Sequence, residues 1–226
     1  MCGRFSLATT KEKLQQQLPF VEVPETLRLS YNIAPTQHAY VITNDNPERM
    51  QYLTWGLVPH WSEDGKNSGR LINARSEGIE AKPSFRVPIR KRRCLVPADS
   101  FYEWRTVGKN KVPYRILLED KGLMVFAGIW DVWYHGDYGL KTFSILTTDA
   151  NEDMADLHNR MPVLLTSPEA QQCWLESEDL GEVLSLLLPA PPHLINKYRV
   201  SDKLNAVAND SPDLHTQVQE PPTLFG

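Results

Sequence analysis

The sequence predicts one α+β domain over residues 1–226, built on antiparallel strands with a barrel-like β core and short peripheral helices. Short apolar and aromatic runs recur along most of the chain and are separated by turn-forming residues, a pattern typical of antiparallel strands. The 17 prolines are spread out, and there is no repeat, low-complexity tract or Gly/Ser linker that would divide the 226 residues. The polar, Pro-rich tail at 211–226 is expected to be loosely held.

The elements expected first are a helix and a strand pair. Thr9 stands three residues before Glu12, the spacing of a capping box, which predicts a short helix to about residue 18. The β-prone residues 39–43 and 51–55 then flank the polar turn 44–47.

The middle of the chain is expected to consist mainly of strands. They are predicted at residues 94–96, 100–104, 114–118, 123–130 and 142–147, with hairpin loops at 108–111 and 135–137. A helix should begin at Ser167, with Pro168 in its first position, and carry Cys173 and Trp174. A last short helix is expected over residues 182–188.

Composition excludes several classes of protein. The net charge of −4 argues against a generally basic nucleic-acid-coating protein but leaves room for a local basic groove. Cys2, Cys94 and Cys173 form an odd count without paired spacing, which favours a reducing, intracellular compartment. No apolar run reaches 18 residues and no signal peptide is evident, so no membrane partner is expected. No P-loop, GxGxxG or GxSxG motif is present, and no cofactor is expected.

Cys2 is the most informative residue because it directly follows Met1. Removal of Met1 would leave an α-amine and a thiol on adjacent carbons, and methionine aminopeptidases prefer small second residues such as cysteine. Such a terminus can condense with an aldehyde to an imine and then close a thiazolidine ring. The alternative is that Cys2 is an inert, buried small residue, as free cysteines often are.

Glu103 and His158 are candidate acid–base residues. Glu103 lies between two aromatic residues and shares a strand face with Phe101, and burial there would raise the pKa of its carboxyl toward neutrality. The alternative for Glu103 is an edge-strand side chain in water. His158 lies in a loop-like stretch before Pro162 and can transfer protons near pH 7, although a lone histidine is more often a surface residue.

Asn73 and Arg75 alternate along a short extended segment. An asparagine can orient a carbonyl and an arginine can hold a phosphate, while the alternative for both is loop bracing. Trp61 follows His60 in an aromatic stretch that could stack on bases, whereas Trp55 is expected in the core. A metal site from Cys2, His158 and Glu103 is not expected, because no spacing typical of metal ligands occurs.

Basic residues cluster where no acid interrupts them, at Arg86, Arg90, Lys91, Arg92 and Arg93. Most charge runs are simply solvated faces. In an acidic chain, however, a local basic island points to phosphate binding.

Six segments, in order over nearly the whole chain, carry a resemblance. They are residues 1–5 (MCGRF), 31–36 (YNIAPT), 55–59 (WGLVP), 71–77 (LINARSE), 101–104 (FYEW) and 157–162 (LHNRMP). Each is weak alone, but in series they resemble the SOS-response-associated peptidase (SRAP) family of abasic-site processing proteins.

The resemblance implies a mechanism and a set of residues. Family members lose Met1 and crosslink to the ring-opened aldehyde of an abasic site in single-stranded DNA. By resemblance, Cys2 supplies both nucleophiles, Asn73 orients the N-terminus and the sugar, and Glu103 and His158 assist the proton transfers. Further positions are implied as DNA contacts, with Ser62 standing where the family has a second tryptophan: Arg4 and Arg75 at phosphates, and Pro35 and Trp61 against bases.

The expected function is therefore DNA-damage processing by a covalent thiazolidine link to DNA, which shields the site from strand cleavage. The resemblance also implies an SOS-response setting, a residual lyase tendency, and a self-processing peptidase activity that is here either unnecessary or limited to Met1; a monomeric protein is expected. An α-amine has a pKa of about 7.7–8.0 and a free thiol about 8.5, so both need little activation at neutral pH. Two alternatives stay open: a cysteine or N-terminal-nucleophile hydrolase of peptides or amides using Cys2, His158 and Glu103, and a non-catalytic reader of single-stranded or modified DNA.

Overall fold

A closed five-stranded β-barrel forms the centre of the computed structural model, which describes residues 2–66 and 69–219. Its strands are β3 (His38–Thr43), β4 (Asn46–Trp55), β6 (Arg93–Ala98), β9 (Met124–His135) and β10 (Tyr138–Asp149). The barrel closes because β10 pairs with β9 on one edge and with β4 on the other. Only the β4–β10 pairing among these five strands is parallel. The predicted α+β class and barrel-like core are confirmed.

Two three-residue strands extend the barrel wall along β10. β5 (Asn73–Arg75) runs parallel to β10, with Asn73 opposite Ile145. β11 (Arg160–Pro162) runs antiparallel to the end of β10. β10 therefore holds segments from both halves of the chain side by side.

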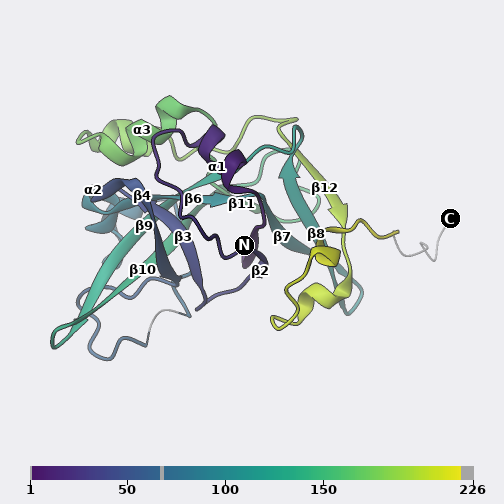
Figure 1. Cartoon of the computed structure of the whole chain (residues 1–226), viewed down its shortest axis with the longest axis horizontal. Coiled ribbons are helices and arrows are strands. Elements are labelled where there is room, and N and C mark those ends of the chain that lie inside the picture. Colours follow the sequence, from purple (N-terminus) through teal and green to yellow (C-terminus); the bar gives the residue numbers. More distant parts are fainter. Residues whose placement is uncertain (1, 67–68, 220–226) are drawn as a thin grey trace.

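A second, five-stranded sheet packs against the barrel, in the order β12-β8-β7-β1-β2. Its strands are β1 (Arg4–Leu7), β2 (Ser30–Ile33), β7 (Ser100–Val107), β8 (Asn110–Leu118) and β12 (Ile195–Arg199). Aromatic rings join the sheet to the barrel. The Phe5 ring lies 5.0 Å from the Trp55 ring, and the Phe101 ring lies 6.0 Å from the Phe126 ring. Figure 1 shows β8 and β12 on the side of the molecule away from α2 and α3.

Short helices lie outside the sheets. They are α1 (Lys11–Gln17), α2 (Pro88–Lys91), α3 (Pro168–Glu176) and α4 (Leu180–Ser185), with 3₁₀ turns at Ile79–Ala81, Asp202–Asn205 and Pro212–His215. α3 begins as predicted, since Ser167 Oγ accepts a hydrogen bond from the Ala170 N–H at 3.2 Å. In the described ranges, no helix combines the length and the apolar character needed to cross a bilayer.

Two predicted helix boundaries are wrong by one to three residues. The cap of α1 is Thr10 rather than Thr9, because Thr10 Oγ1 accepts from the Lys13 N–H at 3.3 Å. The helix predicted at 182–188 begins earlier, after the cap Asp179, and ends at Ser185. The strands β1, β2, β11 and β12 were not predicted, and β5 was expected only as a short extended segment, because pairing with other strands defines them.

Residues 211–219 are docked, although the sequence led us to expect a loose tail from 211. The Leu214 side chain is fully buried in a second hydrophobic cluster with Tyr102, Val200 and Leu204. His215 Nε2 lies 3.2 Å from Ser6 Oγ on β1. Apolar burial and this polar contact hold the segment onto the outer face of the five-stranded sheet. Residues 220–226 lie outside the described part of the chain.

Candidate active site

Strand pairing brings the N-terminus of the chain to Glu103. β1 pairs with β7 so that Arg4 lies opposite Tyr102, and the chain preceding β1 continues past Glu103. The Cys2 side chain is fully buried, and Glu103 is only 4% exposed, which excludes the reading of Glu103 as a side chain in water. Burial raises the pKa of the Cys2 thiol, and the negative charge of nearby Glu103 raises it further.

Asn73 holds the backbone of Cys2. Its Nδ2 donates a hydrogen bond to the carbonyl oxygen of Cys2 at 2.7 Å. Asn73 reaches Cys2 because β5 is aligned on β10, with Asn73 opposite Ile145. The Oδ1 atom of Asn73 is buried and accepts no hydrogen bond from any group between residues 2 and 219 that the structure describes. This leaves an acceptor beside the terminus, in a place where polar groups are normally satisfied.

His158 approaches Glu103 from the loop before β11. The Arg160 N–H donates to His158 Nδ1 at 2.9 Å, so in the neutral ring the proton is carried by Nε2. Burial lowers the pKa of His158, and the negative charge of Glu103 opposes that shift. The loop is fixed to the other sheet by Asp156, which forms ion pairs with Arg105 on β7 at 2.9 Å and with Lys197 on β12.

Arg160 connects the segments that carry Asn73 and His158. This buried side chain forms a forked pair with Glu77, at 2.5 and 3.0 Å, and also contacts Asp149 at 2.7 Å. Its second amine donates to the Thr147 carbonyl at 2.6 Å. Sequence reasoning assigned Arg160 no role, because nothing in the sequence links it to Glu77, 83 residues away. We infer from these contacts that Arg160 fixes the segment after Asn73 and the segment after His158 to β10.

The sequence also carried no signal for Thr147 on β10, a buried residue next to the strand that carries Asn73 and Arg75. Its side chain is fully buried, and it lies opposite Arg75 in the β5–β10 register. Its hydroxyl has no hydrogen-bond partner in the described ranges. A buried hydroxyl has no sequence signal, because threonine is common in strands.

The structure thus gathers Cys2, Asn73, Glu103 and His158 from four distant segments. The site holds a buried thiol, a carbonyl-orienting amide and two acid–base groups, which is the composition of a nucleophilic site. One expectation changes. The thiol does not resemble a free thiol with a pKa of about 8.5, because its pKa is raised, so its reaction at neutral pH needs a base.

Arg4 has an anchoring contact set. Its guanidinium donates to Asn32 Oδ1 at 2.7 Å, to the Leu204 carbonyl at 2.8 Å and to the Asn205 carbonyl at 3.5 Å. The buried Asn32 side chain itself donates to three carbonyls of the segment 204–209. Arg4 therefore joins β1 to the docked C-terminal segment, and its contact with phosphate stays a prediction.

The other predicted DNA contacts lie at the surface. Arg75 is exposed, Pro35 is half-buried, and the Trp61 side chain is 52% exposed. Trp55, in contrast, is fully buried, as expected, and its Nε1 donates to the Ile72 carbonyl at 2.9 Å. The structure leaves Arg75, Pro35 and Trp61 accessible to a ligand, and their roles stay predictions.

The loop that presents Trp61 is anchored on both sides of that residue. The fully buried Asp131 accepts from the His60 N–H at 2.9 Å, and its Oδ2 lies 3.0 Å from His60 Nδ1. Arg92 forms an ion pair with the same carboxylate. On the other side, Trp133 Nε1 donates to the Ser62 carbonyl at 2.6 Å. The backbone around Trp61 is thus held while its own ring projects outward.

Two members of the predicted basic island are structural. The Arg93 side chain is buried, and its guanidinium donates to the carbonyls of Ile89, Arg90, Trp174 and Ser177. Arg92 is engaged by Asp131. Only Arg86, Arg90 and Lys91 of the island remain exposed.

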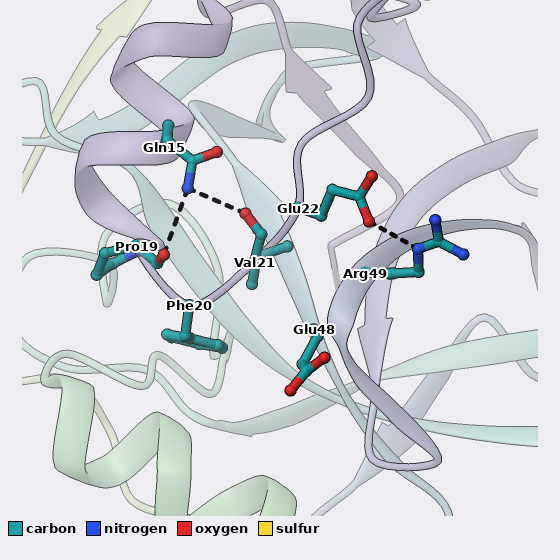
Figure 2. Close-up of a pocket in the computed structure, with 7 residues that line it drawn as sticks. All are labelled: Gln15, Pro19, Phe20, Val21, Glu22, Glu48 and Arg49. Carbon is teal, nitrogen blue, oxygen red and sulfur yellow. Dashed lines mark hydrogen bonds and ion pairs between the residues drawn. The ribbon is translucent and has the colours of Figure 1, made fainter.

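A surface hollow between α1 and β4 is separate from this site. The hollow has a volume of about 630 Å³. Figure 2 shows the residues that line it, and none of the four candidate residues is among them. The side chains of Gln15, Glu22 and Arg49 in this hollow already have partners within it. Gln15 Nε2 donates to the Pro19 and Val21 carbonyls, and Glu22 contacts Arg49 at 2.8 Å. Across the described residues, no group of three or more His, Cys, Asp or Glu side chains is placed to hold a metal ion.

Comparisons with known proteins give one consistent result. Residues 1–207 match the family described as SOS response associated peptidase (SRAP). The chain is 40% identical over 221 residues to "Abasic site processing protein YoaM" of Bacillus subtilis, covering 95% of this chain and 97% of that protein. It is 32% identical over 257 residues to "Abasic site processing protein HMCES" of Gallus gallus, covering 94% and 76%. A crystal structure of a Bacteroides thetaiotaomicron protein superposes with a TM-score of 0.85 at 29% identity, covering 96% of this chain and all of that one.

Proposed function

Because this chain belongs to the SOS response associated peptidase family, we propose that it processes abasic sites in DNA, the activity that the names of its relatives state for them. The substrate is DNA, and the setting is the response to DNA damage. The observation that carries the proposal is the 2.7 Å hydrogen bond from Asn73 to the Cys2 carbonyl, beside buried Glu103 and half-buried His158.

The finer proposal is a covalent link between Cys2 and an abasic site in single-stranded DNA. Met1 lies outside the described residues, and its removal is part of the proposal. Once Met1 has left, the free amine of Cys2 adds to the C1 aldehyde of the ring-opened sugar. The resulting carbinolamine loses water to give an imine. The thiol then adds to the imine carbon, its proton passes to nitrogen, and a thiazolidine is formed with one water released overall.

The electrostatics of the site suggest which residue handles each proton. Burial lowers the pKa of His158, and its ring carries the proton on Nε2, so this N–H can donate a hydrogen bond to the carbinolamine oxygen as water departs. The thiol is held protonated by burial, so ring closure requires an acceptor for its proton. Glu103 is the buried carboxylate whose charge reaches Cys2, and we assign it that role.

Closure of the thiazolidine ring also protects the DNA strand at the crosslinked site. A thiazolidine removes the imine, which would otherwise hydrolyse or allow elimination of the 3′ strand, and we propose that shielding from strand cleavage is the outcome. A residual lyase activity would follow from the same imine. Self-processing would break the peptide bond between Met1 and Cys2, with the thiol of Cys2 as the nucleophile. Exposed Arg75 and Trp61 would contact phosphate and base beside the site.

The test is an adduct assay on a denaturing gel, combined with intact-mass measurement of the purified protein. Wild type should lack Met1 and form a denaturation-resistant adduct with abasic single-stranded DNA. Cys2→Ala should form none, whereas Cys173→Ala, a free cysteine on α3, should react like wild type. Equal crosslinking by Cys2→Ala, or retention of Met1 in the cellular protein, would contradict the thiazolidine mechanism.

The same assay separates the two alternative functions. Turnover of a peptide or amide in the absence of DNA, with no adduct, would favour a hydrolase that uses the same nucleophile. Salt-sensitive DNA binding without an adduct, unchanged by Cys2→Ala, would favour a non-covalent reader.

A further inference from the structure

The segment between β5 and β6 presents a row of basic side chains on one side. Backbone hydrogen bonds from the Arg86 N–H to the Lys82 carbonyl and from the Ile89 N–H to the Phe85 carbonyl, at 2.8 and 2.9 Å, show helical turns leading into α2. Arg86 and Arg90 are exposed and four residues apart, so they share one face of these turns, while half-buried Lys82 precedes the turns in an extended conformation. Phe85 and Ile89 are buried on the other face, which turns the basic row outward.

The charged groups of this row are not neutralised by ion pairs with carboxylates of the described residues. No ion pair joins Lys82, Arg86 or Arg90 to an acid in the described ranges. The sequence has no acidic residue from 81 to 98. Glu77, the carboxylate near Lys82, is already engaged through both oxygens by Arg160. The row is therefore a local positive surface on a chain with a net charge of −4.

The row begins beside the candidate active site. Lys82 Nζ donates to the carbonyl of Arg75 at 3.0 Å, and Arg75 lies two residues after Asn73, which holds Cys2. From Arg86 to Arg90 the helical turn advances about 6 Å further, at about 1.5 Å per residue. Figure 1 shows α2, at the far end of the row, on the side of the molecule away from β12.

The row also has a defined end. Arg90 and Lys91 line a hollow of about 660 Å³ whose opposite wall carries Glu176 and Glu178. Carboxylates repel a polyanion, so we place the end of the basic row at this hollow.

We propose that Arg75, Lys82, Arg86 and Arg90 form a phosphate track that binds the DNA backbone on one flank of the abasic nucleotide. This inference rests on the proposed function and adds the path of the bound strand. Lysine and arginine contacts to phosphate supply affinity independent of sequence, and each contact adds to the salt dependence of binding. An acidic protein needs such a local track, because its overall charge repels DNA.

The test compares Lys82→Gln/Arg86→Gln with Lys109→Gln/Lys121→Gln, a control pair that removes the same charge from two exposed lysines elsewhere on the surface. Binding is measured with an oligonucleotide that carries a tetrahydrofuran abasic analogue, which cannot react with Cys2. Only the track variant should lose affinity several-fold at low salt. Its slope of log affinity against log salt should fall by about 1.4, since each lost single-strand phosphate contact contributes about 0.7.

Oligonucleotides that end at the abasic analogue on either side identify the flank. The difference between the track variant and wild type should vanish when one flank is removed and persist when the other is. Equal losses in the track and control variants, or an unchanged salt slope, would overturn the track. The proposed chemistry fails separately, when wild type binds the oligonucleotide but forms no adduct with a reactive abasic site. Unchanged thermal unfolding midpoints would exclude misfolding as the cause of any loss.

Discussion

The side-chain amide of Asn73 donates a hydrogen bond to the carbonyl oxygen of Cys2 at 2.7 Å. This contact fixes the backbone of Cys2 through its carbonyl group, and neither the backbone nitrogen nor the thiol of Cys2 takes part in it. Orientation of a reacting group is worth large factors in rate, and a displacement of about 1 Å can cost about 100-fold. Cys2 is therefore positioned through its carbonyl oxygen, the one of its polar atoms that the proposed reaction does not use.

Replacement of Asn73 should slow adduct formation without changing the chemistry. Asn73→Ala removes the donor, and we expect a loss of about 10- to 100-fold in the single-turnover rate. Asn73→Asp should be at least as damaging, because a carboxylate would face the Cys2 carbonyl oxygen. Asn196→Ala, at an exposed position of β12, serves as the control. Wild-type rates for both Asn73 variants would show that the anchor is dispensable.

The imidazole of His158 should titrate below its ordinary pKa. Burial lowers this pKa, while the negative charge of Glu103 partly offsets the effect. Glu103→Gln should therefore shift the midpoint further down, because the opposing charge is lost. The measurement is an NMR titration of ring-labelled histidine, assigned with His158→Gln. A midpoint that rises in Glu103→Gln would contradict the predicted proximity of the two groups.

The buried carboxylate of Asp131 should support DNA binding through Trp61. Trp61→Ala should cost about 1–3 kcal/mol of affinity for single-stranded DNA if the ring stacks on a base. Asp131→Asn weakens the anchor of His60, so it should lower affinity in the wild-type background. In the Trp61→Ala background it should have little further effect, because the residue that it positions is gone. Additive losses in the double variant would assign Asp131 a role unrelated to Trp61.

The docked C-terminal segment should make stability depend on pH through His215. Burial lowers the pKa of His215 to about 4, and the positive charge of Arg115 contributes to the shift. The unfolded chain binds this proton near pH 6.5, before the folded chain does, so acidification favours unfolding. The free energy of unfolding should therefore fall between about pH 6.5 and 4, by about 3 kcal/mol from this group.

His215→Gln should remove that part of the pH dependence, because glutamine does not titrate. Urea unfolding at pH 7 and pH 4.5 measures it for both proteins. His135→Gln, a histidine at the exposed end of β9, is the control and should keep the wild-type pH dependence. The same pH dependence in wild type and His215→Gln would show that the segment is not docked around a neutral His215.

Local signals in the sequence were sufficient for the parts of the fold that depend on neighbours in the chain. Ser167 and Pro168 predicted the start of α3, and the apolar run at 123–130 predicted most of β9, because caps and periodicity are local properties. The strand β11, which adjoins His158, escaped prediction, and β5 was predicted only as a short extended segment that carries Asn73 and Arg75. Both are defined by hydrogen bonds to β10, and no local signal shows that pairing.

By itself the sequence determined which residues could carry the chemistry and where most of the strands lie along the chain. Residue type and spacing are sufficient for both. Tertiary structure decided the states of those residues. It buried Cys2 and Glu103 together and so raised the pKa of the thiol. It also divided one basic run into buried Arg93, Arg92 engaged by Asp131, and exposed Arg86, Arg90 and Lys91. The physical reason is that protonation and availability depend on burial and on partners that are distant in the chain.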